Sequence, residues 1–440
     1  MTVTHAGLAQ ISELLKTNYR DVMVDSIYQD VTLYDLIPKY TGDVRGSTVN
    51  HAVELQRSHG GGARGSGEFL PVDYPESFKQ SSVSLTRWYW TVSIDGYAIS
   101  LFKKGAGSFV DYLDMRMRNA ERDAANQLNR MCHMDGFGVL AITNGAVTAG
   151  TTITLKHVWP NGYNAGTPSG GTNYSFGATQ FLEEGDSIRI TDPSNTASWV
   201  TSTIASIDWD NQTITLDDTV TIGSNWVVSH GDQFGTSFDT TAKEANGLRG
   251  LVKNTGTVQG IDCDGVNGFR RWRSTIIDKT SAPVPYDWTH VTRIVSACMY
   301  KGSSGPQKLV VLCHPAMLEE HQRLVDPDLR YEPVNFQLNK GLEAPVFTVM
   351  GQRVPVRTSL HMGFQEMLAL NTAELERMEL APMDWDDQDG NVIKQLQGKD
   401  AVYAYLKYYW AVAARSLNHF ARFDGIQVDT EFVKVLQETS

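Results

Sequence analysis

The most suggestive chemical pattern in the sequence is a glycine-rich stretch near the N-terminus. Residues 57–69 read RSHGGGARGSGEF, and Gly60, Gly62 and Gly65 satisfy the G-x-G-x-x-G pattern of a dinucleotide-binding loop. Such a loop binds phosphate because a helix begins directly after it and presents free N–H groups to the anion. The segment after Gly65 contains two prolines and has no helical periodicity. We therefore interpret the glycines as a flexible loop rather than a nucleotide site.

A second candidate is the adjacent pair Cys313 and His314, which resembles half of a thiol catalytic site. Both residues follow a run typical of a buried strand, where neighbouring side chains point to opposite faces. A nucleophile and its base cannot meet in that arrangement. His321 adds no metal site, because its spacing from His314 does not match the H-E-x-x-H pattern.

Two charged stretches complete the search for chemistry. The stretch DWDDQDGNVIKQL resembles a calcium loop, but Trp385 occupies the first ligand position and Leu396 the last, where a carboxylate is needed. The basic cluster FRRWRS, residues 269–274, lies in a chain of net charge -12, so we expect a surface or intersubunit role rather than nucleic-acid binding. The sequence therefore predicts no catalytic, cofactor or metal site, and a protein that is not an enzyme.

Composition narrows the class of protein further. The chain has 440 residues, enough for about three domains, and 41% of them are hydrophobic. The four cysteines form no C-x-x-C pair, which excludes a zinc knuckle and favours a reduced cytoplasm. The first residues lack the pattern of a signal peptide, and no apolar run approaches the roughly 20 residues that span a bilayer. We therefore expect no membrane association.

The glycine-rich stretch must be positioned by the elements around it. Residues 7–20 have helical periodicity and residues 26–40 read as extended, so together they predict an N-terminal arm. Residues 47–56 and 79–99 are rich in strand-forming residues and flank the glycines. The pattern predicts a long two-stranded hairpin with a flexible tip.

One long helix follows, from a plausible N-cap at Ser108 to a stop at Gly136. Charged residues on its other face are expected to be mainly solvated, although they could pair across subunits. These charged residues are Arg116, Arg118, Glu121, Arg122, Asp123 and Arg130. Apolar residues at helical spacing predict a face that packs on a core. They are Leu113, Met117, Ala120, Ala124, Leu128 and Met131.

The rest of the chain alternates between β-rich and mixed segments. Residues 145–240 contain short alternating runs between turn signals, which predicts a small sandwich or barrel inserted into the chain. After Gly247 the pattern predicts a helix over 287–299 and a buried strand over 308–315 that runs into another helix. Further strands are expected over 346–358, and the aromatic run 401–426 reads as an extended strand pair.

This order of segments resembles the major capsid proteins of tailed double-stranded DNA bacteriophages, the Hong Kong 97-like capsid fold. The stretch NGLRGLVKNTGTVQGID followed by Trp272 between arginines is similar to a segment common in such proteins; its landmarks are Gly247, Leu248, Gly260 and Ile261. The resemblance implies an α+β fold with an inserted β-rich domain. Its parts are an N-terminal arm (1–46), an extended hairpin loop (47–100), a peripheral domain with a spine helix (101–144), the insertion (145–240), an axial α/β domain (241–375), and peripheral strands with a C-terminal segment (376–440).

The resemblance also implies partners. The chain is expected to assemble with itself into hexamers and pentamers of an icosahedral shell, assembled in the host cytoplasm, that encloses double-stranded DNA without sequence specificity. A separate scaffolding protein is implied because only about 45 residues precede the hairpin. A portal and a decoration protein are further expected partners. Two alternatives remain: an encapsulin-type compartment shell, and an enzyme with a β-rich substrate domain that would use the glycine loop and Cys313–His314.

Within this family the glycine-rich tip is interpreted as an intersubunit contact. Apolar side chains at the end of a projecting hairpin have no core of their own to pack on, so they need a neighbour's surface. Glycine allows one sequence to adopt the several conformations that hexamers and pentamers require. The predicted contact residues are Gly60, Gly62, Arg64, Gly65, Gly67, Glu68, Phe69, Leu70 and Tyr74.

Overall fold

The computed structural model describes most of the chain. The described residues are 30–40, 42, 44–58, 60–73, 75–96, 108–158, 163–164, 167–168, 177–231, 235–264, 271–301, 308–325, 346–349, 351–387, 391–395 and 398–429. Only the backbone is described at 108–115, 163–164, 167–168, 325 and 346–348. The helix expected over 7–20 lies outside these ranges.

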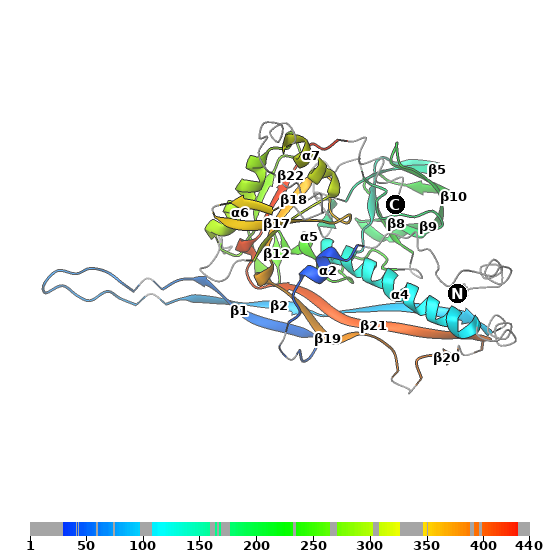
Figure 1. The fold of residues 1–440 in the computed structure, drawn as a ribbon, viewed down its shortest axis with the longest axis horizontal. Coiled ribbons are helices and arrows are strands. Elements are labelled where there is room, and N and C mark those ends of the chain that lie inside the picture. Colours follow the sequence, from blue (N-terminus) through cyan, green and yellow to red (C-terminus); the bar gives the residue numbers. More distant parts are fainter. Residues whose placement is uncertain are drawn as a thin grey trace, which may run out of the picture.

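A sheet of long strands forms the base of the body (Figure 1). Its central strand β21 (Ala401–Ala414) pairs along one edge with β3 (Thr86–Asp95) and along the other with β19 (Leu375–Trp385) and β20 (Lys394–Gln395). Side chains of β21 alternate between two clusters: Tyr408 and Trp410 join the main core, whereas Ala411 lies in a smaller cluster on the other face.

Two strand predictions were wrong in this sheet. The run 401–426 is not a strand pair, because a turn with buried Leu417 and Phe420 carries the chain from β21 into β22 (Ala421–Asp424) of a different sheet. The run 79–99 was expected to be one strand of the hairpin, but it contributes to two strands. Strand β2 (Ser77–Ser84) pairs with β1 (Thr48–Gln56), whereas β3 pairs with β21.

A six-stranded mixed sheet forms the second layer. Its order is β14 (Thr275–Asp278), β22, β18 (Glu366–Asn371), β15 (Leu309–Cys313), β17 (Gln352–Thr358) and β16 (Val346–Val349). Helix α6 (Trp288–Lys301) packs on one face. Alternate residues of β15 serve the two faces: Val311 joins the core under α6, and Leu312 joins the main core on the opposite side. This explains why the strand is apolar throughout. Helix α7 (Pro315–Val325) follows β15 directly.

The long helix α4 (Ser108–His133) is 26 residues long and runs along the long-stranded sheet, on the side of the barrel (Figure 1). It ends close to the predicted stop, Gly136, which has a φ of +87° that favours glycine. One charged residue departs from the expected solvated face. Arg130 is buried and its Nη2 donates to Oε1 of buried Glu244 at 2.7 Å, because the linker that contains Glu244 crosses this end of the helix.

Two short helices pack against the C-terminal part of α4. Residues Thr32–Leu36 form helix α2, so the arm segment 26–40 is not extended throughout as predicted; Leu33 and Ile37 pack into the main core. Helix α5 (Leu248–Leu251) begins beside the C-terminal end of α4. A Cβ at Gly247 would lie 2.3 Å from the carbonyl oxygens of Met131 and Cys132, so this close approach requires glycine. The remaining pair is β12 (Thr257–Val258) with β13 (Ile261–Asp262).

Six strands of the inserted region form a closed barrel. In order around the barrel they are β10 (Thr213–Ile222), β5 (Val147–Lys156), β4 (Ala141–Thr143), β11 (Val227–His230), β8 (Ser187–Asp192) and β9 (Asn195–Asp208). Apolar side chains, including Ile153, Ile190 and Ile214, fill the interior. Strand β4 lies before the expected boundary at 145, since the short apolar run that forms it closes the barrel between β5 and β11. A small pair, β6 (Tyr163–Asn164) and β7 (Thr167–Pro168), lies within this region.

Candidate functional site

The hairpin of β1 and β2 is attached to the body at its base. The strands pair antiparallel from Thr48–Ser84 to Gln56–Ser77, with a register shift between Glu54 and Gln56. Ser82 N donates to Gln259 O at 2.9 Å, and Val83 packs with residues of the long-stranded sheet. Beyond these strands, the described residues 60–73 extend away from the body at one end of the molecule (Figure 1).

The tip of this loop carries large apolar side chains in solvent. Phe69 is 95% exposed, Leu70 84% and Val72 85%, far more than any apolar side chain in the sheets. A turn fixes the chain just before them, in which Gly65 N donates to Glu68 Oε2 at 2.9 Å. Gly67 has a φ of +87° within this turn. Tyr74 lies outside the described residues.

The other predicted contact residues lie on the same loop. Gly60, Gly62 and Arg64 precede the turn, and a Cβ at the neighbouring Gly61 would meet no atom within 4 Å. No helix follows the glycines, because residues 66–73 form only a turn and extended chain. The geometry that binds a dinucleotide phosphate is therefore absent from this described part of the loop.

A groove at the base of the hairpin is the second exposed apolar surface. Tyr89 is 50% exposed and Leu380 47%. The groove has a volume of about 390 Å³. It is lined by Gly46, Ser47, Leu85, Thr86, Arg87, Tyr89, Leu380 and Tyr409.

Cys313 is the last residue of β15 and His314 directly precedes α7, which lies far from the hairpin tip (Figure 1). Both side chains are buried. Burial raises the pKa of the Cys313 thiol to about 12 and lowers the pKa of His314 to about 3. The Nδ1 atom of His314 accepts a hydrogen bond from Ala316 N at 3.1 Å. A thiol that stays protonated beside a ring engaged with the backbone has the properties of a core pair rather than a nucleophile and base.

The charged stretches have structural partners. Asp386, next to Asp387 in the acidic stretch, pairs with Lys394 at 3.0 Å and with Lys407 at 2.6 Å. Asp389 and Gly390 lie outside the described residues. In the basic cluster, Trp272 is fully buried and its Nε1 donates to Val258 O at 3.2 Å, so this residue is part of the core and not of a surface feature.

Burial of the predicted core face of α4 increases towards the C-terminal end of the helix. Ala124 and Leu128 are fully buried, and Met117 is half-buried. The side chain of Leu113 lies outside the described residues. Leu128 belongs to the main core, together with Met131 of the same helix and Trp410 of β21.

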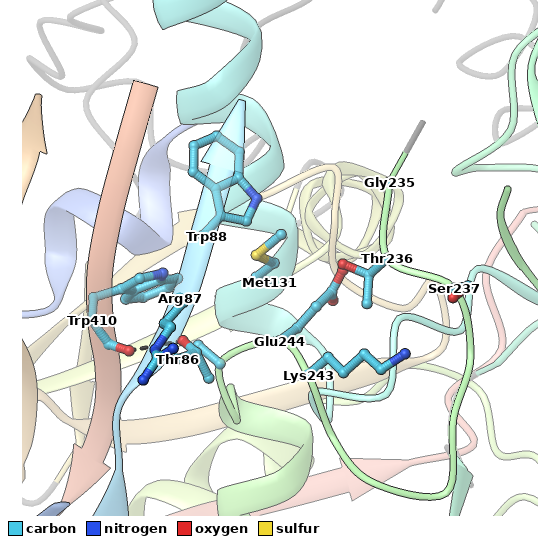
Figure 2. Close-up of a pocket in the computed structure, with 11 residues that line it drawn as sticks. Thr86, Arg87, Trp88, Met131, Gly235, Thr236, Ser237, Lys243, Glu244 and Trp410 are labelled. Atoms are coloured by element: carbon cyan, nitrogen blue, oxygen red, sulfur yellow. Dashed lines mark hydrogen bonds between the residues drawn. The ribbon is translucent and has the colours of Figure 1, made fainter. Parts of the chain in front are cut away.

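A polar cleft that the sequence did not indicate lies where β3, α4, β21 and the linker after the barrel meet (Figure 2). Its volume is about 280 Å³. Arg87 and Lys243 supply cationic groups, and Thr86 Oγ1 donates to Trp410 O at 2.8 Å. The described lining includes no histidine or cysteine that could act as a base or nucleophile. Its residues come from four separate segments, so no local sequence pattern could have marked it.

Within the described ranges, no three His, Cys, Asp or Glu side chains gather in an arrangement that could hold a metal ion. The helices of this same part of the chain include none that is long and apolar enough to cross a membrane.

Comparison with solved structures identifies the fold. The chain superimposes on the capsid asymmetric unit of Cyanophage A-1(L) with a TM-score of 0.56 and 13% identity, over 94% of this chain and 98% of that one. It superimposes on the capsid of a native GTA particle with a TM-score of 0.50 and 9% identity, over 97% of this chain and 100% of that one. The chain therefore has an α+β phage-capsid fold over nearly its whole length. No family model and no curated protein sequence matches it.

Proposed function

We propose that this chain is the major capsid protein of a tailed double-stranded DNA bacteriophage, a shell protein rather than an enzyme. In this proposal it assembles into hexamers and pentamers of an icosahedral shell that encloses the genome. The similarity in fold to two capsid structures supports the shell role.

The observation that carries the proposal is the exposed tip of the hairpin. Burial of Phe69, Leu70 and Val72 against another surface would each stabilise an assembly by roughly 1.5–3 kcal/mol. Their own subunit offers no such surface within the described residues, because the loop extends away from the body (Figure 1). A second copy of the chain can supply the surface, and head-to-tail contacts of this kind form rings when the rotation between copies closes.

The groove at the base of the hairpin suits the tip of a neighbouring copy. It is apolar around Tyr89 and Leu380, and Arg87 provides a charge opposite to that of Glu68 on the tip. Gly61 has open space around it, so the loop can change direction between subunit environments without moving the body. Contacts at the tip can then persist in rings of five and of six subunits.

The finer assignment of the fold follows from the same proposal. In a Hong Kong 97-like arrangement, β1 and β2 form the extended loop, α4 is the spine helix, and the sheet of β3, β19 and β21 provides the peripheral strands. The six-stranded sheet with α6 and α7 is the axial domain, and the barrel is the inserted domain. The arm includes α2.

The proposed partners are those of a capsid protein. They are further copies of the chain, a separate scaffolding protein, a portal, a decoration protein and packaged double-stranded DNA bound without sequence specificity. The protein is placed in the virion capsid after assembly in the host cytoplasm.

Expression of the chain, alone and with the scaffolding protein encoded beside it, tests the proposal. Size-exclusion chromatography followed by negative-stain electron microscopy should reveal closed shells tens of nanometres across or discrete five- and six-membered rings. A protein that stays monomeric under both conditions would contradict the assignment. Shells that enclose a cargo protein instead of DNA when isolated from their native source would favour the encapsulin-type compartment.

A further inference from the structure

A buried polar cluster joins three elements distant in sequence. It consists of Asp30 of the arm, Asn129 and His133 of α4, and Ser359 and His361 of the turn after β17; we call these five residues the clasp. Asp30 is 3% exposed, Asn129 and His133 are fully buried, and the least buried member, His361, is 9% exposed. Polar groups withdrawn from water in this way require specific partners.

Two members of the clasp hold helix α2 at its N-terminal end. The first N–H groups of any helix have no partner within the helix. In α2, Thr32 N donates to Asp30 Oδ1 at 2.9 Å, and Leu33 N and Tyr34 N both donate to Asn129 Oδ1 at 3.0 Å. A five-residue helix is too short to form alone in water. Its presence in the arm therefore depends on tertiary contacts, which are the core packing of Leu33 and the two hydrogen bonds to Asn129 of α4.

The hydrogen bonds of Asn129 define the protonation of His361. Because its oxygen accepts two backbone N–H groups, its Nδ2 must donate the 2.8 Å hydrogen bond to His361 Nδ1. That ring nitrogen must then carry a lone pair. His361 is consequently neutral, with its proton on Nε2, when the arm is docked.

The hydroxyl of Ser359 determines, in the same way, which ring nitrogen of His133 carries a proton. Although burial alone would raise the pKa of Asp30, hydrogen bonds from Ser359 and from the Thr32 backbone lower it, so the carboxylate is ionised and only accepts. Ser359 Oγ uses its one proton to donate to Asp30 Oδ2. It must therefore accept the 3.0 Å hydrogen bond from Nε2–H of His133.

The charges that face His361 come from each element packed on it. Asp30 Oδ2 of the arm lies 3.6 Å from its Nδ1 and favours the charged ring. Arg130 of α4, itself paired with Glu244, opposes that charge. The ring of His133 lies with its centroid 6.1 Å away and is also neutral.

A turn of the inserted region, just before β8, also packs on the ring. Phe181 stacks on His361 with a centroid distance of 6.1 Å and an interplanar angle of 14°. The neutral, buried His157 lies behind Phe181, with its centroid 5.9 Å from that ring. Burial, the largest influence, lowers the pKa of His361 to about 4.

We propose that the clasp is an acid-sensitive latch: protonation of His361 at Nδ1 releases arm residues 30–37 from α4. The added proton comes from solvent and occupies the lone pair to which Asn129 Nδ2 donates, so two N–H groups then face each other. The new N–H instead has the Asp30 carboxylate 3.6 Å away. Asn129 must turn, and the end of α2 loses the acceptor of two N–H groups. This inference concerns the isolated subunit and does not rest on the proposed function.

The direction of the pH effect follows from linkage. In the released arm His361 would titrate near its ordinary pKa of 6.5, and in the docked arm near 4. Between these values the released state binds more protons, so docking is complete above pH 6.5 and weakens by up to about tenfold per pH unit as the pH falls towards 4. The carboxylate of Asp30 takes up a proton only below its ordinary pKa of 3.8, which lies outside this pH window.

Hydrogen–deuterium exchange of the full chain tests the latch. Protection of the amides of Thr32, Leu33 and Tyr34, corrected for the intrinsic pH dependence of exchange, should fall at least tenfold between pH 6.5 and pH 4. In His361→Asn, whose side-chain oxygen can accept from Asn129 without titrating, protection should persist over that range. The matched control is His321→Asn on α7, a half-buried histidine with a lowered pKa that contacts Tyr286; it should behave as the wild type.

Unchanged wild-type protection at pH 4 would overturn the proposal, as would a His361→Asn variant that loses protection at the same pH as the wild type. If the arm of His361→Asn is already released at pH 7, the pH dependence of amide protection in the wild type still tests the proposal. The ring ¹⁵N signals of His361 should titrate with the same midpoint as the loss of protection. Midpoints separated by more than one pH unit would contradict the latch.

Discussion

Replacement of Leu128 by alanine probes whether α4 packs on the main core as described. Leu128 is fully buried and lies in one cluster with Met131, Leu33 and Trp410. Removing three carbon atoms from this site loses about 2.4 kcal/mol of transfer free energy at about 0.8 kcal/mol per methylene. The cavity left behind raises the expected loss in unfolding free energy to about 3–4 kcal/mol. For a chain of this length, that loss corresponds to a fall in Tm of about 3–4 °C.

The assay is chemical and thermal unfolding of the unassembled subunit, monitored by circular dichroism. Met117→Ala is the matched control, because Met117 lies on the same face but is only half-buried, so its loss should be less than half as large. Leu128→Asp would place an unpaired carboxylate in the core and should give misfolded or insoluble protein. Equal losses for Leu128→Ala and Met117→Ala, or normal folding of Leu128→Asp, would refute the packing of this face.

Three further predictions test other parts of the fold. Fragment 139–231 should show dispersed amide signals and a cooperative melt, whereas fragment 145–231, which lacks β4, should not, because the barrel is open between β5 and β11; equal melting would contradict the strand order. Gly247→Ala should lower Tm, since its Cβ would lie 2.3 Å from two carbonyl oxygens of α4, while Gly61→Ala should leave Tm unchanged. Burial raises the pKa of Glu366 to about 7. The free energy of unfolding of the wild type, measured by urea denaturation, should therefore fall as the pH rises from 4.5 to 7, whereas that of Glu366→Gln should not. Parallel pH profiles of the two proteins would refute this.

Elements with strong local periodicity could be predicted from the sequence. The spacing of apolar residues in α4 and α6 identified both helices, and the apolar run before Pro315 identified β15 and α7. These patterns arise because one stripe of a helix, or both faces of a central strand, must leave water. The composition of the inserted region likewise indicated a small β sandwich or barrel.

Partners distant in sequence could not be predicted. Strand β3 reads like a continuation of the hairpin, yet it pairs with β21, more than 300 residues later, and periodicity does not specify a strand's neighbour. Arg130 resembles the solvated residues beside it, because its buried partner Glu244 is 114 residues away. The cluster of Asp30, Asn129 and Ser359 is assembled from three such segments and leaves no motif.

In the candidate site, too, local features could be predicted from the sequence and distant partners could not. Local sequence indicated a projecting glycine-rich loop with apolar residues at its tip, and Phe69 and Leu70 are indeed exposed there. In the proposed assembly, the surface that receives them belongs to another copy of the chain, and no pattern within the hairpin specifies it. The groove around Tyr89 and Leu380 combines residues of β3 and β19, which the sequence did not bring together.

The most direct test of the assembly role is to replace residues 59–69 with a short turn and examine the product by electron microscopy. The paired strands β1 and β2 remain, so circular dichroism and Tm should match the wild type, but closed shells or rings should not form. Trp199→Ala is the control, since it removes an exposed aromatic side chain, 46% exposed, from the barrel and should leave assembly intact. Normal shells without the tip would contradict the account, as would binding of a dinucleotide by the intact protein that the replacement abolishes.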